Sequence, residues 1–150
     1  MSKTDILTLL THDHRAVEAG LKTLIAQSEQ TTRVDRAKVT QLIHALDLHT
    51  RIEETCLYPK AEKEREASNL VQDFYSEHRE VRGLLTKLEH CQDNTTLARL
   101  SQEILTHLQF HIRDEESQLF PLLRREWEEQ VLISLGEQMQ ELKERELSGH

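Results

Sequence analysis

One pattern of residues occurs twice in the chain and limits the fold more than any other feature. Residues 49–59 and 111–121 share histidine, arginine, a pair of glutamates, leucine and proline at matching positions, with an aromatic residue before each proline. Residues 13–15 and 77–79 add a second match, in which an acidic residue is followed by histidine and arginine. Self-similarity of this kind is typical of a protein built from repeated supersecondary units. We therefore expect two similar halves with a pseudo-symmetric site between them.

The apolar residues follow the period of a helix. They recur three and four positions apart through nearly the whole chain, whereas a strand would alternate every second residue. Four glycines and two prolines among 150 residues leave few helix breakers. The pattern predicts helices over about residues 4–27, 39–57, 71–88, 97–122 and 127–142, with loops at 28–35, 67–69 and 91–96. The second helix should bend or end near Pro59, because proline removes a helix hydrogen bond.

Long helices joined by short loops pack as antiparallel neighbours. The predicted fold is therefore all-α, with an antiparallel up-down-up-down four-helix bundle over residues 1–125. Residues 126–150 are expected to form an additional amphipathic helix, which either packs on the bundle or joins two copies in a homodimer. A chain of this length buries a core without disulfides or structural metal, so a bound metal would serve function.

Composition and charge exclude several classes of partner. The formal net charge is −8 with histidine neutral, and no clustered basic face is present, so we expect no binding to nucleic acid. Charges interrupt every apolar window, and nothing resembles a signal peptide, so we expect no membrane segment and a soluble, cytoplasmic protein. Cys56 and Cys91 lack the spacing of a zinc ribbon, and they are expected to be reduced core or boundary residues.

Each of the four main predicted helices carries one histidine on its apolar stripe. These histidines are His14, His49, His78 and His111. Glu53 and Glu115 each follow a histidine by four residues, so they lie on the same helix face, one turn further along. Inward positions at matching depth converge in a bundle, which brings four imidazoles and two carboxylates to one place.

Such a cluster favours metal binding. Ionised carboxylates without a positive partner are very costly to bury. Mixed imidazole and carboxylate ligands suit iron or manganese, whereas structural zinc prefers cysteine-rich sites and calcium takes oxygen ligands. We predict a pair of iron ions, with Glu53 and Glu115 as bridges between them and the histidines as terminal ligands.

Two other kinds of metal site do not fit the sequence. Ferritin-like proteins use Glu-x-x-His, and no histidine here has a glutamate three residues before it. The HExxH motif of zinc proteases is also absent. The order His-x-x-x-Glu, present twice and each time preceded by a helix with one histidine, resembles the HHE family of hemerythrin-like proteins. The resemblance extends over about residues 7–123.

The resemblance implies a non-haem di-iron centre bridged by two carboxylates and an oxygen atom, for which manganese or zinc can substitute. It also implies that one iron keeps an open position for dioxygen or another small diatomic or peroxide ligand. The implied ligands are the repeat-related residues His14, His49, Glu53, His78, His111 and Glu115.

The sequence departs from hemerythrin in its third helix. Hemerythrin carries two histidines four residues apart there, whereas this chain has Phe74 one turn before His78. His107, one turn before His111, is the candidate for the seventh ligand, and a capping role or a role in orienting another ligand is the alternative. Glu18, one turn after His14, is a weaker candidate.

We expect four neighbours of the predicted ligands to have structural roles and not to bind metal or substrate. Glu54 and Glu116 follow the bridging glutamates directly, so they are expected to face another direction and to be solvated or paired with arginine. Tyr58 and Phe120 are expected to pack the end of the bundle and not to contact a substrate.

The sequence is compatible with three functions. The first is a di-iron protein that binds or senses dioxygen, or reacts with nitric oxide or peroxide. The second is a di-iron enzyme in peroxide or nitric oxide detoxification or in iron-sulfur cluster repair, although no residue in the sequence is committed to electron or proton delivery. The third is a purely structural interaction module.

Overall fold

The computed structural model describes residues 3–30 and 33–148, and these residues form helices and loops with no strand. The helices are α1 (Ile6–Ser28), α2 (Arg36–Ile52), α3 (Tyr58–Ala61), α4 (Ser68–His90), α5 (Asn94–Asp114), α6 (Phe120–Glu126) and α7 (Glu129–Ser148). Two π-helical turns, Glu53–Leu57 and Glu115–Leu119, join α2 to α3 and α5 to α6. The all-α prediction is confirmed.

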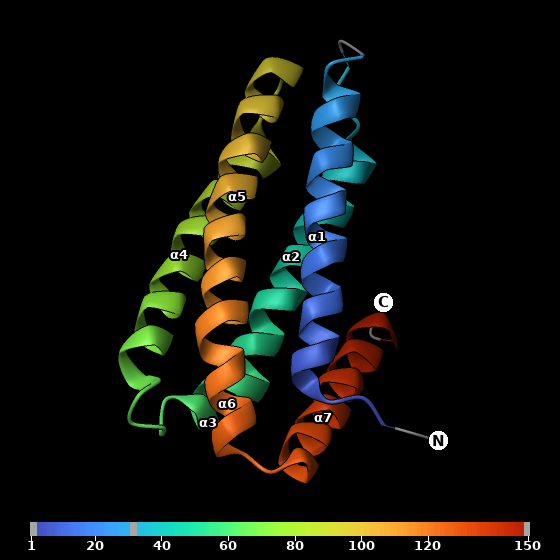
Figure 1. Cartoon of the computed structure of the whole chain (residues 1–150). Coiled ribbons are helices and arrows are strands. Elements are labelled where there is room, and N and C mark those ends of the chain that lie inside the picture. The colour runs from blue at the N-terminus through green and yellow to red at the C-terminus, as the bar shows by residue number, and fades with distance from the viewer. Residues whose placement is uncertain (1–2, 31–32, 149–150) are drawn as a thin grey trace.

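Four long helical rods make up the bundle: α1, α2 with α3, α4, and α5 with α6 (Figure 1). Helix α1 packs against α2 and α5, and α4 packs against the same two helices from the opposite corner. Because consecutive rods reverse direction, the bundle is antiparallel, as predicted. Helix α7 turns back at the end of α6 and lies beside α1.

Aspartates set the starts of three helices. The side chain of Asp5 accepts a hydrogen bond from the Thr8 amide at 2.9 Å, and Asp35 and Asp93 cap α2 and α5 in the same way. The loop predicted at 67–69 lies earlier, at residues 62–67. It is displaced because the buried Ala67 already accepts a helical hydrogen bond, from the amide of Val71.

The helices that contain Pro59 and Pro121 widen and continue, and they do not end. In each π-helical turn the amide of the residue before the proline donates to a carbonyl five residues back, from Tyr58 to Glu53 and from Phe120 to Glu115. A proline has no amide hydrogen and collides with the carbonyl of the preceding turn, so a wider turn accommodates it. The repeat therefore encodes the same local distortion twice, directly after each His-x-x-x-Glu sequence.

The core consists of two apolar clusters with a polar layer between them. The cluster at the α7 end contains residues such as Leu10, Leu57 and Phe74. The cluster at the other end contains residues such as Leu46 and Ile104. Most of the buried polar side chains lie between the two, so apolar layers shield the polar layer from both ends of the bundle.

Helix α7 covers one side of this bundle within the same chain. Its residues Leu132, Leu135 and Met139 are buried in the apolar cluster at that end. Cys56 and Cys91 are buried and free, as expected. Within the described residues, no helix is long and apolar enough to cross a membrane.

Gly136 of α7 supports a prediction about this packing. A Cβ atom at Gly136 would overlap the carbonyl oxygen of Thr4, so Gly136→Ala should push α7 away from the start of α1. We expect a loss of about 1–3 kcal/mol in the free energy of unfolding, as for other overpacked sites. Urea denaturation measures it.

Gly83→Ala is the matched control, because a Cβ at this glycine in α4 meets no atom within 4 Å. Alanine there should stabilise the protein by about 0.5–1 kcal/mol, since glycine is the poorer helix former. Equal effects of the two substitutions would show that α7 does not pack as described.

Candidate metal centre

The polar layer of the bundle contains the four histidines and two glutamates that the repeat predicts. Each side chain is at most 2 % exposed. The histidines come one each from α1, α2, α4 and α5, and they are His14, His49, His78 and His111. Glu53 and Glu115 are the first residues of the two π-helical turns, so each extends its carboxylate from the end of a helix into the layer.

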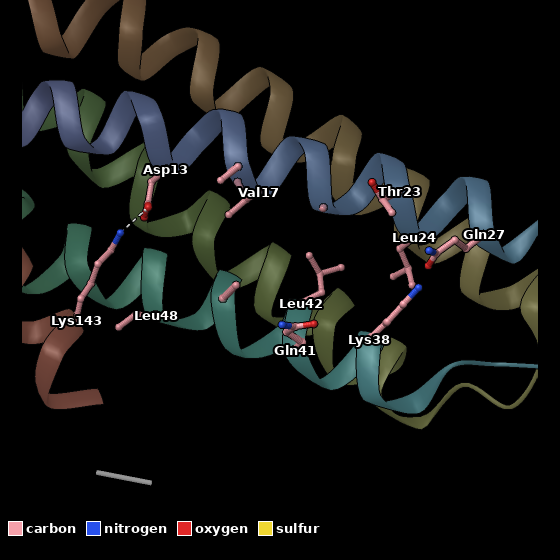
Figure 2. A pocket seen from close by; sticks show the side chains of 13 residues that line it. Asp13, Val17, Thr23, Leu24, Gln27, Lys38, Gln41, Leu42, Leu48 and Lys143 are labelled. Carbon is pink, nitrogen blue, oxygen red and sulfur yellow. Dashed lines mark hydrogen bonds and ion pairs between the residues drawn. The ribbon is translucent and has the colours of Figure 1, made fainter. Parts of the chain in front are cut away.

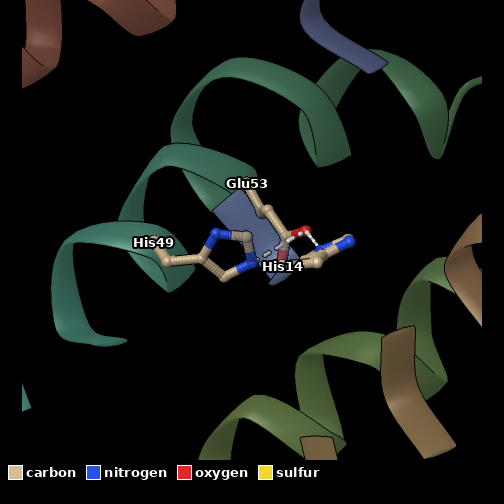
Figure 3. A group of neighbouring side chains, drawn as sticks. All are labelled: His14, His49 and Glu53. Carbon is tan, nitrogen blue, oxygen red and sulfur yellow. Dashed lines mark hydrogen bonds and ion pairs between the residues drawn. The ribbon is translucent and has the colours of Figure 1, made fainter. Parts of the chain in front are cut away.

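One half of the cluster consists of His14, His49 and Glu53 (Figure 3). The Oε2 atom of Glu53 lies 3.3 Å from His14 Nε2 and 3.4 Å from His49 Nε2. The two imidazole rings meet edge to face with their centroids 4.8 Å apart. These three donor atoms point at one another from α1, from α2 and from the π-helical turn.

The other half consists of His78, His111 and the same Glu53. Here the second carboxylate oxygen, Oε1, lies 3.0 Å from His78 Nε2 and 3.6 Å from His111 Nε2. The two Nε2 atoms are 3.1 Å apart. Glu53 therefore directs one oxygen to each pair of histidines, which is the arrangement expected of a bridging carboxylate.

Glu115 approaches both halves with one atom. Its Oε1 lies 3.1 Å from His14 Nε2 and 3.3 Å from His111 Nε2. No donor is aligned with this oxygen for a hydrogen bond, although the atom is completely buried. A buried carboxylate oxygen without a hydrogen bond is costly, and a cation is the partner that satisfies it.

The outward nitrogen of every histidine in the cluster is bound to a carboxylate. The Nδ1 pairs are His14 with Glu116 at 2.7 Å, His49 with Asp13 at 3.1 Å, His78 with Glu54 at 2.6 Å, and His111 with Glu77 at 2.7 Å. Because a carboxylate accepts hydrogen bonds, Nδ1 carries the proton in each ring. Nε2 then faces inward and is the nitrogen that can exchange its proton for a metal ion, as in histidines that ligate metals.

These outer carboxylates also follow the internal repeat. Asp13 and Glu77, the residues before the first histidine of each half, hold the second histidine of the same hairpin. Glu54 and Glu116 instead hold a histidine of the opposite hairpin. The sequence shows all four residues as part of the repeat, so their matched positions were the signal that could have identified their role.

Cations support three of the outer carboxylates. Arg82 lies 3.0 Å from Glu54, and Arg15 donates to Glu116. The prediction that these glutamates pair with arginine is therefore confirmed, and their contacts with the outer nitrogens of His78 and His14 are a role that the sequence interpretation missed. The third cation is Lys143 of α7, whose Nζ lies 2.6 Å from an oxygen of Asp13 (Figure 2).

The pKa values reflect the close contact of imidazoles and carboxylates. Burial alone would lower the pKa of His14, but Glu115 and Glu53 outweigh it and raise the pKa to about 10. Burial also opposes the rise at His49, whose pKa reaches about 9 because of Glu53 and Asp13. Burial would raise the pKa of Glu53, yet His49 and the other imidazoles hold it well below its usual range. A divalent cation that binds here replaces protons on the imidazoles.

The chemistry of these donors fits a pair of divalent metal ions. His78 and His111 bring two nitrogen lone pairs to within 3.1 Å of each other, which is unfavourable unless a proton or a cation lies between them. Glu115 leaves one buried oxygen without a hydrogen bond. Imidazole nitrogens and bridging carboxylates are the ligands that iron, manganese and zinc take in helical bundles. The described residues thus offer two adjacent groups of metal donors that share Glu53.

The structure does not bring His107 to this cluster. Its side chain is 44 % exposed and lies 3.4 Å from Glu80. The inward position one turn before His111 belongs to Leu108, three residues back, which is buried. His107, four residues back, is rotated out to the surface. Glu18 also lies outside the cluster, in a 2.6 Å ion pair with Arg15.

Phe74 and Tyr58 close the cluster on the side of His78 and His111. The Phe74 ring lies edge-on to His111, with centroids 4.9 Å apart, where hemerythrin would place a histidine. Tyr58 is completely buried at this end of the bundle, as predicted. Its hydroxyl, however, reaches the cluster and donates to Glu115 Oε2 at 2.5 Å, a contact that the sequence interpretation missed.

A groove of about 430 Å³ runs between α1 and α2 beside this centre (Figure 2). Its walls include Val17 and Leu42, and the ion pair between Asp13 and Lys143 lies at one end. None of the six predicted ligands lines it. Asp13 belongs to both the groove and the metal centre, because one of its oxygens pairs with Lys143 and the other binds His49.

Comparison with known families agrees with this geometry. The family model described as the Hemerythrin HHE cation binding domain matches residues 5–123, which contain all six residues of the cluster. The same model also matches residues 69–148, and this second match begins with the second helical hairpin. A comparison with curated proteins finds no match.

The outer carboxylates generate a prediction about metal affinity. Asp13→Asn and Glu77→Gln remove the charge that holds His49 and His111 in position and makes their inward nitrogens more basic. Each should weaken metal binding by about 10–100-fold, the usual effect of such neighbours of metal ligands. Titration against a competing chelator measures the affinity.

Asp47→Asn is the control, because Asp47 of α2 pairs with Arg51 at the surface. It should bind metal like the unaltered chain. Affinities for the Asp13 and Glu77 variants equal to that of the control would contradict a role for these carboxylates in metal binding.

Proposed function

Because the chain belongs to the Hemerythrin HHE cation binding domain family, we propose that it is a non-haem di-iron protein that binds or senses dioxygen or a related small ligand. One observation carries the proposal. Glu53 directs its two oxygens to two separate pairs of buried histidines, His14 with His49 and His78 with His111. A pair of divalent ions that share this carboxylate would be the simplest occupant of such a pair of sites.

The proposed ligands are the six residues of the polar layer. Each ion takes two histidines, and the bridging carboxylates are Glu53 and Glu115. The combination of four imidazoles and two carboxylates supports iron, with manganese or zinc as substitutes, because a softer metal would favour sulfur ligands. When bound, a reduced pair of irons supplies electrons to a small ligand such as dioxygen, nitric oxide or peroxide.

The chain itself holds and shields this centre. The apolar clusters on both sides exclude water from the polar layer, and the outer carboxylates fix the orientation of all four imidazoles. Small diatomic ligands and peroxide match a centre enclosed in this way, whereas a large substrate would need an open cleft to reach it. Turnover of peroxide or nitric oxide, the enzymatic alternative, is separated from reversible binding by steady-state consumption assays.

The proposal predicts metal content and colour. After anaerobic reconstitution, the chain should hold about two irons per molecule, as other carboxylate-bridged centres in helical bundles do. Addition of oxygen to the reduced protein should change its visible ligand-to-iron charge-transfer absorption. Colourless protein without iron after this treatment would rule out the proposal.

A double substitution tests the proposed ligands. His49→Ala with His111→Ala removes one nitrogen donor from each ion, so most of the iron and the colour should be lost. His107→Ala is the matched control on α5, because this histidine is exposed outside the cluster, and it should leave the iron content unchanged. If the double variant keeps its iron and its stability, the chain is better described as a structural interaction module.

A further inference from the structure

Tyr58 places a phenol hydroxyl among the proposed ligands. It is fully buried, and its ring packs against Phe74 and Tyr75 with centroids 5.9 and 5.3 Å away. It directly follows the π-helical turn that begins with Glu53, so the same widened turn that presents the bridging carboxylate also orients the phenol. The hydroxyl points into the half of the cluster that contains His78 and His111.

The distances from this hydroxyl oxygen match those within a metal coordination sphere. It lies 3.1 Å from Glu53 Oε1, 3.2 Å from His111 Nε2 and 3.4 Å from His78 Nε2. Donor atoms that each sit ~2.1 Å from one ion are separated from their neighbours by roughly 3.0–3.4 Å in octahedral or tetrahedral geometry. The distances from the phenol oxygen to these three atoms are therefore those expected between ligands of the same ion.

We propose that the Tyr58 hydroxyl oxygen is a seventh protein ligand, bound to the iron that His78, His111 and Glu53 hold. This inference rests on the proposed di-iron function and adds a donor to it. The O–H bond of Tyr58 breaks, an oxygen–iron bond forms, and the proton passes to solvent, with no change in oxidation state. An anionic phenol oxygen is a hard donor that suits iron in its oxidised form.

The internal repeat shows why the other half of the cluster lacks this ligand. Phe120 takes the position of Tyr58 in the second copy of the pattern, and its ring stacks on His14 with centroids 6.0 Å apart. Phenylalanine offers no donor oxygen. The ion beside His14 and His49 therefore has one protein ligand fewer, and it is the ion that keeps room for a small exogenous ligand.

Absorption and resonance Raman spectra of the iron(III)-loaded protein test the proposal. The unaltered chain should show a phenolate-to-iron(III) charge-transfer band and the enhanced ring vibrations of a bound phenolate. Tyr58→Phe should lose both while it keeps its iron, because Phe120 shows that the repeat accepts phenylalanine at this position. Tyr75→Phe is the control for the only other tyrosine of the chain and should leave both signals unchanged.

Isotope labelling keeps the test independent of how the variants fold. In the unaltered protein, ring-deuterated tyrosine should shift the enhanced vibrations. An iron-loaded protein without phenolate bands would overturn the Tyr58 assignment but leave the di-iron function intact, and the hydroxyl would then be a hydrogen-bond donor to Glu115. A chain that binds no iron would instead refute the proposed function itself.

Discussion

Two carboxylates buried in the middle of a helical bundle are the constraint on which the rest of this structure depends. Glu53 and Glu115 are fully enclosed, and the free-energy penalty for each such charge is several kcal/mol unless positive partners surround it. The four imidazoles of the polar layer are those partners. Each imidazole is in turn held by an outer carboxylate, and Arg15, Arg82 and Lys143 neutralise three of these. Charge therefore alternates outward from the centre to the surface.

The same local structure, a π-helical turn, occurs twice and brings both glutamates into the polar layer. A π-helical turn precedes the proline that lies ten residues after the histidine, and the first residue of that turn is the buried glutamate of the polar layer. The wider turn lets the rod continue, so apolar residues beyond it still form a closed core next to α7. Loss of the turn would move both carboxylates and the apolar layer that shields them.

Much of this could be predicted from the sequence. Helical periodicity predicted the bundle, and the repeat predicted which six side chains meet, because matched positions on four antiparallel helices converge. Helical periodicity could not predict which of two adjacent residues faces the interior of the bundle. His107 and Leu108 are both near one turn before His111, and only the packed structure shows that Leu108 faces inward. Glu54 and Glu116, one residue after Glu53 and Glu115, bind the outer nitrogens of His78 and His14, a role that periodicity alone does not report.

Tyr58 shows a second limit of sequence patterns. The repeat aligns it with Phe120 and so suggested a common packing role, but the pattern does not report where a hydroxyl points. The structure resolves the two roles: the ring packs the end of the bundle while the oxygen joins the cluster. The pseudo-symmetry of the fold is thus broken at the position of Tyr58 and Phe120, beside the proposed metal ligands.

The central claim is that Glu53 joins two metal ions, one held by His14 with His49 and the other by His78 with His111. Anomalous diffraction at the iron absorption edge, from crystals of the iron-loaded protein, tests it most directly. The account predicts two anomalous peaks in the polar layer, one on each side of the Glu53 carboxylate and each within bonding distance of its two Nε2 atoms. A single peak, or peaks outside this layer, would contradict it.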